Sequence, residues 1–329
     1  MESTRRSFLI KSSFVGMGLI GAVTQGVCAL DFESGFKMVS TTSTQDSVSM
    51  LKIGYLPITD HLLILSGSLP NATINYRALR FSSWADLAQT FSSGSLDAAF
   101  ILAPLALKIY TQGIKMKAIM ATHRHGSALV VGKNSHIDSY EKLKGAKIAI
   151  PSRFSIHYIL LCELLTKNHI DLNGVKFIDM SPPEMVYSLS RNAIDGFIVA
   201  EPFAFQAERL NVGRVFVLTK DIRANHACCI LCVNEQLYND KESLKNLVDT
   251  FSNGVQFIYE NPSQAAEISK QFLGQKPNLI DALLREKDRI TYTHLKLQDE
   301  EIQEIAKNAQ DLKLGQFKIE GFLDSDFVR

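Results

Sequence analysis

Short apolar runs rich in β-branched residues alternate with amphipathic stretches along most of the chain, and this alternation limits the possible folds more than any other feature. Ten runs have the length and composition of strands: 51–56, 73–79, 97–101, 117–121, 128–132, 147–150, 175–179, 196–199, 215–218 and 227–233. The stretches between them begin at recognisable helix caps, such as Ser83 three residues before Asp86, and Ser181 ahead of two prolines. This pattern predicts an α/β fold, with mainly parallel sheets that helices cover on both faces.

The predicted strands fall into two groups, roughly 50–122 and 127–220, and the chain after residue 233 is predicted to be helical to its end. The simplest arrangement is two lobes, the second inserted into the first. Lobe 1 would comprise 50–124 and 227–329, and lobe 2 would comprise 125–226. Open parallel sheets bind ligands at the carboxyl ends of their strands. The loops that follow the strands are therefore expected to face a cleft between the lobes.

The first thirty residues have the pattern of an export leader. Arg5-Arg6 precedes an apolar stretch from about Phe14 to Val23, which is shorter than the roughly 20 residues that span a bilayer. The run from Ser3 to Lys11 resembles a twin-arginine signal. We expect a signal peptide over 1–29, a linker over 30–49 and a location in the periplasm. An uncleaved membrane anchor is the alternative, and no later segment reaches transmembrane length.

The net charge and the cysteines bear on two kinds of partner, nucleic acids and metal ions. The net charge is only +1 and there is no long basic run, so we expect no nucleic-acid partner. Beyond the leader the cysteines are Cys162, Cys228, Cys229 and Cys232. In a strand over 227–233, Cys228 and Cys232 would lie roughly 13 Å apart, and neighbouring residues would point to opposite faces. We expect buried structural thiols, with no metal site and no cofactor.

Three segments carry a resemblance to a known class of proteins. They are 52–61 (KIGYLPITDH), 94–104 (GSLDAAFILAP) and 195–202 (DGFIVAEP). They resemble the nitrate/sulfonate/taurine/bicarbonate class of ABC transporter solute-binding proteins, over about residues 50–260. The resemblance implies the two-lobed type II periplasmic-binding fold, a small anion or zwitterion bound in the cleft, a permease of the inner membrane as partner, and no enzymatic activity. We expect a monomer.

The resemblance also indicates where the ligand would bind. Trp84 matches an anion-contacting tryptophan of the nitrate and bicarbonate branch, and His157 matches a ligand histidine of that branch. A lysine that precedes an Asn-His pair there is replaced by Ala224, which leaves Arg223 as the candidate cation. The full set of candidate ligand-binding residues is Thr59, His61, Ser83, Trp84, Ala103, Ser155, His157, Glu201 and Arg223.

The physical chemistry of these residues leaves alternatives open. Helices that begin near Ser83, Ala103 and Ser155 offer backbone N–H groups to an oxyanion, but both serines can equally be only helix caps. Trp84 can equally pack in the core, and His157 can be a histidine with internal partners.

Glu201 bears on the kind of ligand. A carboxylate beside a bound anion is repulsive unless something positive intervenes. A ligand ammonium, as in taurine, would resolve the conflict. A bound metal ion would also resolve it, and so would a Glu201 side chain turned away to fix the Pro202 turn.

The chief rival function is an enzyme on the same fold. Thiamine-pyrimidine synthases resemble this class and use a lysine for pyridoxal phosphate, with a histidine four residues later. The corresponding positions hold Ile101 and Leu105, which cannot form a Schiff base. A receptor for a thiamine-pyrimidine precursor and a soluble sensor remain alternatives.

Overall fold

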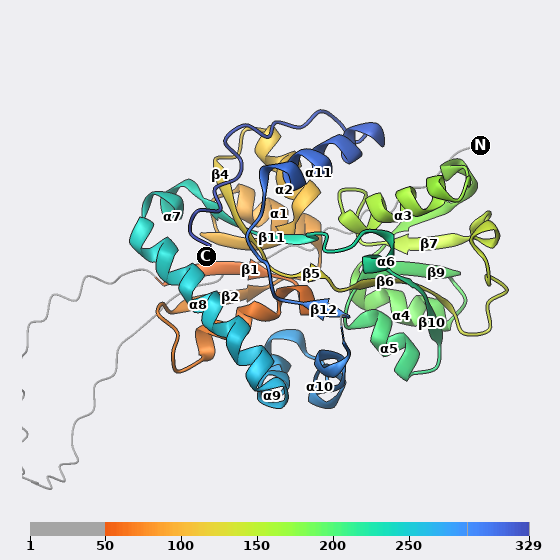
Figure 1. The fold of residues 1–329 in the computed structure, drawn as a ribbon, viewed down its shortest axis with the longest axis horizontal. Helices are drawn as coiled ribbons and strands as arrows, with labels where there is room; N and C mark the ends of the chain where they lie inside the picture. The colour runs from red at the N-terminus through yellow and green to blue at the C-terminus, as the bar shows by residue number, and fades with distance from the viewer. Residues whose placement is uncertain (1–49, 288, 329) are drawn as a thin grey trace, which may run out of the picture. The chain divides into compact units, whose positions relative to one another are not determined.

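A computed structural model describes residues 50–287 and 289–328. The predicted leader (1–29) and linker (30–49) lie outside these residues. The described residues form two five-stranded sheets flanked by helices, together with one two-stranded ribbon (Figure 1). The predicted α/β fold class is therefore confirmed.

The first sheet has the strand order β2-β1-β3-β11-β4. Its strands are β1 (Leu51–Tyr55), β2 (Tyr76–Arg80), β3 (Ala98–Leu102), β4 (Met116–Ala121) and β11 (Cys229–Asn234). Strand β1 pairs in parallel with β2 and β3, whereas β11 is antiparallel to both β3 and β4. Four strands therefore run in one direction and β11 in the other, which is the mainly parallel arrangement that the sequence predicts.

The second sheet repeats this plan with the order β10-β6-β9-β7-β8. Its strands are β6 (Ser127–Gly132), β7 (Lys147–Ile150), β8 (Lys176–Asp179), β9 (Gly196–Ala200) and β10 (Gly213–Leu218). Strand β7 is parallel to β8 and β9, and β6 is antiparallel to β9 and β10. In each sheet the reversed strand, β6 or β11, is the first one formed after the chain arrives from the other sheet.

Helices follow most strands and cover the sheets. The α-helices up to β11 are α1 (Trp84–Ser92), α2 (Ala103–Thr111), α3 (Ile156–Lys167), α4 (Pro182–Ser190), α5 (Phe203–Arg209) and α6 (Thr219–Ile222). Three 3-10 helices accompany them: η1 (Thr59–Ser68), η2 (Tyr140–Leu143) and η3 (Leu172–Gly174). After β11 come α7 (Glu235–Asn239), α8 (Lys241–Glu260), α9 (Pro262–Leu273), α10 (Pro277–Arg285) and α11 (Asp299–Asp311).

The segment after β11 departs from the prediction that it is helical to its end. Strand β12 (Ile290–Thr291) interrupts it and pairs with β5 (Arg124–His125) in the segment that joins the two sheets. Neither two-residue strand has a recognisable sequence pattern. Across residues 50–287 and 289–328, no helix is both long enough and apolar enough to cross a membrane.

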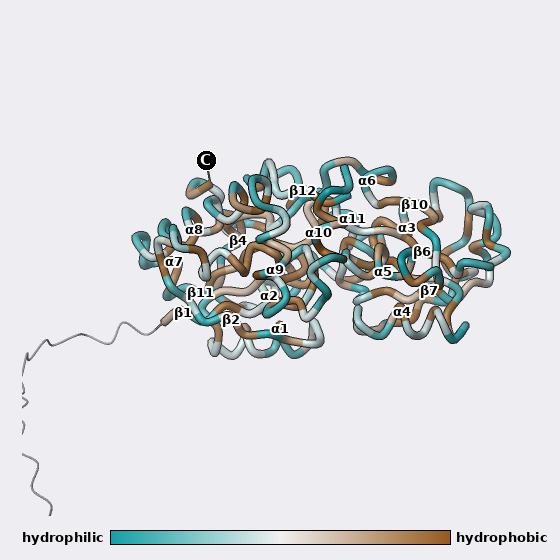
Figure 2. Tube along the Cα trace, turned by 90° about the horizontal axis from the view of Figure 1, so that it is seen from below, coloured by the Kyte–Doolittle hydropathy of each residue, from teal (hydrophilic) through white to brown (hydrophobic). Residues whose placement is uncertain are grey.

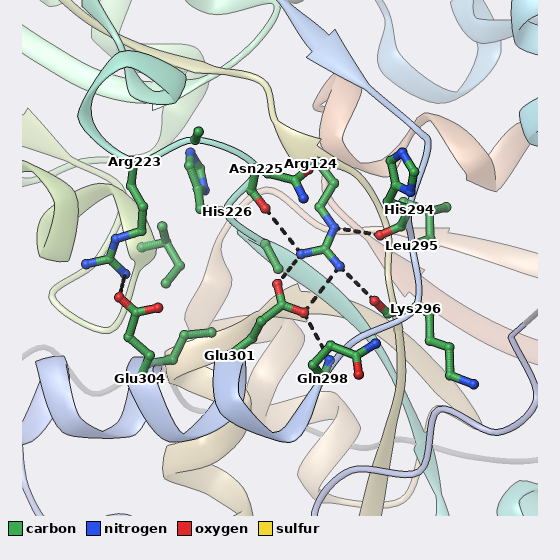
Figure 3. A pocket seen from close by; sticks show the side chains of 14 residues that line it. Arg124, Arg223, Asn225, His226, His294, Leu295, Lys296, Gln298, Glu301 and Glu304 are labelled. Carbon is green, nitrogen blue, oxygen red and sulfur yellow. Dashed lines mark hydrogen bonds and ion pairs between the residues drawn. The ribbon is translucent and has the colours of Figure 1, made fainter.

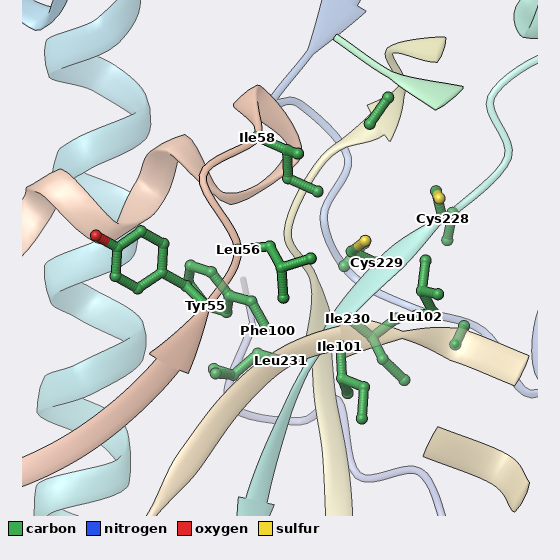
Figure 4. Packing of buried hydrophobic residues seen from close by; sticks show 14 of the residues in the cluster. Tyr55, Leu56, Ile58, Phe100, Ile101, Leu102, Cys228, Cys229, Ile230 and Leu231 are labelled. Carbon is green, nitrogen blue, oxygen red and sulfur yellow. The ribbon is translucent and has the colours of Figure 1, made fainter. Parts of the chain in front are cut away.

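The core lies along the central strands. Strands β3 and β9 are buried at every residue, because each is covered on both faces. Figure 2 shows hydrophobic stretches along the interior strands and hydrophilic ones along the outer loops. Figure 4 shows Ile101 beside its partner Ile230 of β11, Phe100 near Tyr55, and Cys228 and Cys229 where β11 begins.

Local signals in the sequence were mostly accurate. Each of the ten predicted strands is present, with the largest shift at β2, which begins at Tyr76 and not at residue 73. The Ser83 hydroxyl caps α1 by accepting a hydrogen bond from the Asp86 backbone N–H at 3.1 Å. Ser181 is the N-cap residue of α4, as predicted, but its side chain makes no capping hydrogen bond. Pro182 begins that helix, at a position where its missing N–H costs little.

Candidate functional site

Polar side chains from four segments meet where strands of both sheets end. These segments are η1 after β1, the residues after β4, the first turn of α3 after β7, and the start of β11. The residues that meet there are Asp60, His61, His123, His157, Cys228 and Cys229, and we call them the polar cluster. All six are buried, with at most 1% of any of them exposed. Buried titratable groups are rare unless they are paired or bind a ligand, so this cluster is the first candidate for a functional site.

The cluster is held together by contacts across the two sheets. Asp60 Oδ2 lies 3.0 Å from His123 Nε2 and 4.0 Å from Cys229 Sγ. Cys228 Sγ lies 3.8 Å from Nδ1 of His157, and Nε2 of the same ring is 2.9 Å from the Ser127 hydroxyl on β6. His157 and Ser127 belong to the second sheet and its helices, whereas Asp60 follows β1 of the first. Both sheets therefore contribute to one buried site.

Burial and mutual contact set the protonation of these groups. Burial raises the pKa of Asp60 to about 6, although the adjacent His123 lowers it in part. Burial alone would lower the pKa of His123, but the Asp60 carboxylate raises it to about 9. Between these values Asp60 and His123 form an ion pair. Burial lowers the pKa of His61 to about 3, so that ring is neutral at ordinary pH.

The two cysteines at the start of β11 are shifted in opposite directions. Burial would raise the pKa of Cys228, but its contacts with Cys229, His157 and His123 hold that pKa well below the usual thiol value. Burial and the neighbouring Cys228 raise the pKa of Cys229 well above it. The cluster thus holds one thiol that deprotonates readily and one that does not.

Three polar atoms, one in the cluster and two on residues next to its members, have unused hydrogen-bonding capacity. Thr59 Oγ1, His61 Nε2 and Trp84 Nε1 are buried and have no hydrogen-bond partner within residues 50–287 and 289–328. The His61 and Trp84 rings meet edge to face, with centroids 5.6 Å apart. His61 Nδ1 lies 2.9 Å from the Leu56 backbone nitrogen and 3.2 Å from the Leu56 carbonyl oxygen; in the tautomer that accepts from the Leu56 N–H, the neutral ring carries its proton on Nε2. All three groups can donate a hydrogen bond, and we call them the donor set.

Three of the predicted site residues serve as helix starts. The Ser83 hydroxyl caps α1, and the Ser155 hydroxyl accepts from the Tyr158 backbone N–H at 3.1 Å at the start of α3. The backbone N–H of Ala103 donates to the Cys228 carbonyl at 3.0 Å, so it is already engaged. The capping role that the sequence left open is therefore present for both serines.

Glu201 is satisfied within the protein. Its Oε1 is 2.6 Å from Arg289 Nε, and its Oε2 accepts a hydrogen bond from the Phe205 backbone N–H at 2.9 Å. Arg289 also pairs with Glu208 at 2.7 Å. Burial raises the pKa of Glu201, and Arg289 lowers it in part. The sequence left three explanations for Glu201 open: a ligand ammonium, a metal ion, or a side chain turned away from the ligand. This geometry favours the third.

Arg223 is also engaged, on the wall of a pocket of about 760 Å³ (Figure 3). Its guanidinium is 2.5 Å from a Glu163 carboxylate oxygen and 3.1 Å from one of Glu304. The facing wall holds Arg124, which donates to the Glu301 carboxylate and to backbone carbonyls, including that of His294 at 2.8 Å. These arginines join the segments that form the pocket and are not part of the polar cluster.

Comparison with known proteins agrees with the fold. A model of the NMT1-like family matches residues 44–274. The chain belongs to the NMT1-like family. Among curated proteins, the taurine-binding periplasmic protein of Escherichia coli K12 is 30% identical over 134 residues, which are 40% of this chain and 40% of that protein. The chain spans less than half the length of the curated relatives it matches.

Solved structures give the same fold for this NMT1-like chain. The ligand-binding component of an ABC-type import system from Staphylococcus aureus, solved with zinc bound, is 25% identical with a TM-score of 0.76, over 84% of this chain and 97% of that one. The periplasmic nitrate-binding protein NrtA from Synechocystis PCC 6803 is 16% identical with a TM-score of 0.73, over 81% and 82% of the two chains. The likeness to the nitrate-binding protein supports the two-lobed periplasmic-binding fold, which the three sequence segments had implied.

Sequence reasoning named Thr59, His61, Trp84 and His157 but missed how Asp60, His123 and the cysteines combine. It also predicted that Cys228 and Cys229 point to opposite faces of one strand. That prediction is wrong, because β11 begins only at Cys229 and the two sulfurs lie within 4.8 Å of one another. No spacing rule links residues 60, 123 and 228, since only the strand order brings them together.

Proposed function

We propose that the protein captures a small oxyanion as the solute-binding component of an ABC importer. The donor set carries this proposal, because its members are buried together and offer hydrogen bonds that the described part of the protein does not use. A buried donor without a partner costs about 1–3 kcal/mol, and donors of this kind are rare in folded proteins. Oxygen atoms of a ligand would give these groups the hydrogen-bond acceptors that they lack.

The chemistry of the donor set suits an anion. Thr59, His61 and Trp84 are neutral donors in a site from which water is largely excluded, where hydrogen bonds to a charged acceptor are stronger than in water. The Asp60 carboxylate nearby would repel an anion, but its charge is balanced by His123 at 3.0 Å. Relatives and structural neighbours include nitrate-, taurine- and alkanesulfonate-binding proteins.

An oxyanion fits better than a zwitterion. A ligand ammonium needs a carboxylate that is free to receive it. Glu201, the sequence candidate for that role, is occupied by Arg289 at 2.6 Å and by a backbone N–H. Nitrate, bicarbonate and alkanesulfonates are therefore preferred over taurine as solutes.

The wider role follows from this assignment. The chain would act in the periplasm, exported through its Arg5-Arg6 leader, and would deliver its solute to an inner-membrane permease as a monomer. Residues 50–124 with 227–329 and residues 125–226 would be the two lobes that close on the solute. An enzymatic role is not proposed, since Ile101 and Leu105 occupy the positions where the related synthases need a lysine and a histidine.

Calorimetry of the purified protein against nitrate, bicarbonate, an alkanesulfonate and taurine tests the proposal. Thr59→Val removes an unpartnered hydroxyl, so it should leave stability unchanged while it weakens the oxyanion by about ten- to hundredfold. Thr219→Val is the matched control, because the Thr219 hydroxyl is equally buried but donates to the Ser127 carbonyl at 2.9 Å. This control should lose stability and bind normally.

Two results would contradict the proposal. One is that none of the four solutes binds to the parent protein. The other is that Thr59→Val binds the preferred oxyanion as tightly as Thr219→Val does.

A further inference from the structure

Four members of the polar cluster have the composition and spacing of a metal site. Asp60, His123, Cys228 and Cys229 offer a carboxylate oxygen, an imidazole nitrogen and two sulfurs, which all lie within 4.8 Å of one another. We propose that these four residues bind a divalent transition-metal ion, with Zn²⁺ as the best fit. This site goes beyond solute capture and does not depend on which solute the donor set binds.

The distances between the ligand atoms are close to those of a tetrahedral site. Bonds of about 2.0–2.3 Å from zinc place neighbouring ligand atoms about 3.3–3.8 Å apart. Asp60 Oδ2 is already 3.0 Å from His123 Nε2 and 4.0 Å from Cys229 Sγ. The other pairs of ligand atoms lie within 4.8 Å, so side-chain movements of about an ångström would bring them to these distances around an ion.

The type of ligand selects the type of metal. Thiolate and imidazole ligands favour Zn²⁺ and its neighbours, whereas Ca²⁺ and Mg²⁺ require oxygen ligands in larger number. Four protein ligands fill a tetrahedral shell, which is the arrangement of structural zinc sites. On binding, both sulfurs coordinate as thiolates and His123 as a neutral imidazole. The Cys229 thiol and the protonated His123 ring therefore release their protons to solvent, as does any Cys228 that still carries one.

The alternative is an internal ion pair between Asp60 and His123, 3.0 Å apart, beside two inert thiols. Two buried sulfurs beside a buried carboxylate have no packing advantage over apolar side chains. A metal ion accounts for the presence of all four groups in one place.

His157 is a neighbour of the site and not one of its ligands. Its ring nitrogens lie 3.8 and 3.9 Å from Cys228 Sγ, but Nε2 is engaged by the Ser127 hydroxyl at 2.9 Å. It can orient Cys228 in the way that outer partners orient metal ligands.

The position of the ligands gives the ion a structural consequence. Asp60 lies in η1, His123 follows β4 where the chain leaves the first sheet, and Cys228 precedes β11 where the chain returns to it. An ion bound to all three would link both connecting segments to η1. It would restrain the parts of the chain on which any movement between the sheets depends.

The test is metal titration of the full-length protein, purified under reducing and metal-free conditions. One equivalent of Co²⁺ should give the visible bands of a tetrahedral site and an ultraviolet thiolate-to-metal band, and Zn²⁺ should displace it. X-ray absorption of the zinc-loaded parent protein should show two sulfur and two nitrogen or oxygen neighbours, at about 2.3 and 2.0–2.2 Å. This measurement needs no variant, so it decides the matter even where a variant folds poorly.

Matched serine variants identify the ligands. Cys228→Ser should weaken Zn²⁺ by more than the roughly 10–100-fold that follows the loss of an outer-shell partner, and should abolish the thiolate band. Cys232→Ser changes an equally buried thiol, four residues later in β11, that lies outside the cluster, so this variant should bind Zn²⁺ as the parent does.

Three results would overturn the proposal. They are a parent protein that binds no Co²⁺ or Zn²⁺ at micromolar concentration, equal affinities in the two serine variants, and a disulfide between Cys228 and Cys229 in the protein as isolated from the periplasm. Solute binding by calorimetry is read separately, so a failure of the metal site is distinct from a failure of solute capture.

Discussion

Replacement of Trp84 by phenylalanine separates solute binding from packing. Trp84 is the only tryptophan of the chain, is 5% exposed, and has an indole N–H without a partner in the described structure. Phenylalanine keeps one aromatic ring against His61 but removes the donor. The lost apolar contacts should cost on the order of 1–3 kcal/mol in unfolding free energy. Removal of a buried, unpartnered N–H should raise the unfolding free energy by about 1–3 kcal/mol, so the two effects should nearly cancel.

The effect on binding should be larger than the effect on folding. If the indole N–H donates to a bound oxyanion, its loss costs about 1.5–3 kcal/mol, which is roughly a ten- to hundredfold weaker affinity. Urea unfolding measures the first quantity and calorimetry against nitrate and an alkanesulfonate measures the second. In the parent protein, the same solutes should also change the emission of this single indole saturably.

A particular pair of results would refute this reasoning. A Trp84→Phe protein that is clearly less stable yet binds its solute with the affinity of the parent would make Trp84 a core residue only. An emission spectrum that stays constant as a bound solute saturates the protein would lead to the same conclusion.

Three further predictions concern other parts of the chain. Glu201→Gln should lower the unfolding free energy in urea by about 1.5–3 kcal/mol, because buried Arg289 loses one charged partner but keeps Glu208 at 2.7 Å, and the ratio of taurine to alkanesulfonate affinity should not change. Gly254→Ala should lower the free energy of unfolding, measured by thermal unfolding, by about 1–3 kcal/mol. Alanine favours a helix more than glycine does, but its Cβ would lie 1.8 Å from Ser66 Oγ. Replacement of Arg5-Arg6 by two lysines should leave precursor in the cytoplasm on fractionation; normal export would exclude the twin-arginine route.

Local patterns predicted the elements well because they depend on neighbouring residues. The run 98–102 is apolar throughout, as a strand buried on both faces must be, and it forms β3. The cap at Ser83 depends on a residue three positions away, and it is present. The ribbon of β5 and β12 escaped prediction because each strand has two residues and pairs with one about 165 positions distant.

The polar cluster escaped prediction for a related reason. Asp60, His123 and Cys229 follow or begin strands β1, β4 and β11, and they meet only because the sheet has the order β1-β3-β11-β4. Strand alternation also misled the analysis of Cys228. Its carbonyl bonds to the Ala103 N–H and its neighbour Ala227 bridges to Arg124, so the chain is still crossing between sheets at that point.

The two proposed sites are not electrostatically independent, because Thr59, Asp60 and His61 are consecutive and supply both of them. Without a metal, the Asp60 and His123 charges cancel beside the donor set, and the readily deprotonated Cys228 lies 3.8 Å from His157, whose pKa it raises. With Zn²⁺ bound, two thiolates and one carboxylate outweigh the ion, and the site carries a net charge of about −1. A negative charge so close to the donor set disfavours a second anion there. Binding linkage is reciprocal, so a bound oxyanion must lower the affinity for the metal by the same factor by which the metal lowers the affinity for the oxyanion. The final occupancies of the two sites therefore depend on the concentrations of metal and oxyanion. They do not depend on the order in which the two are added.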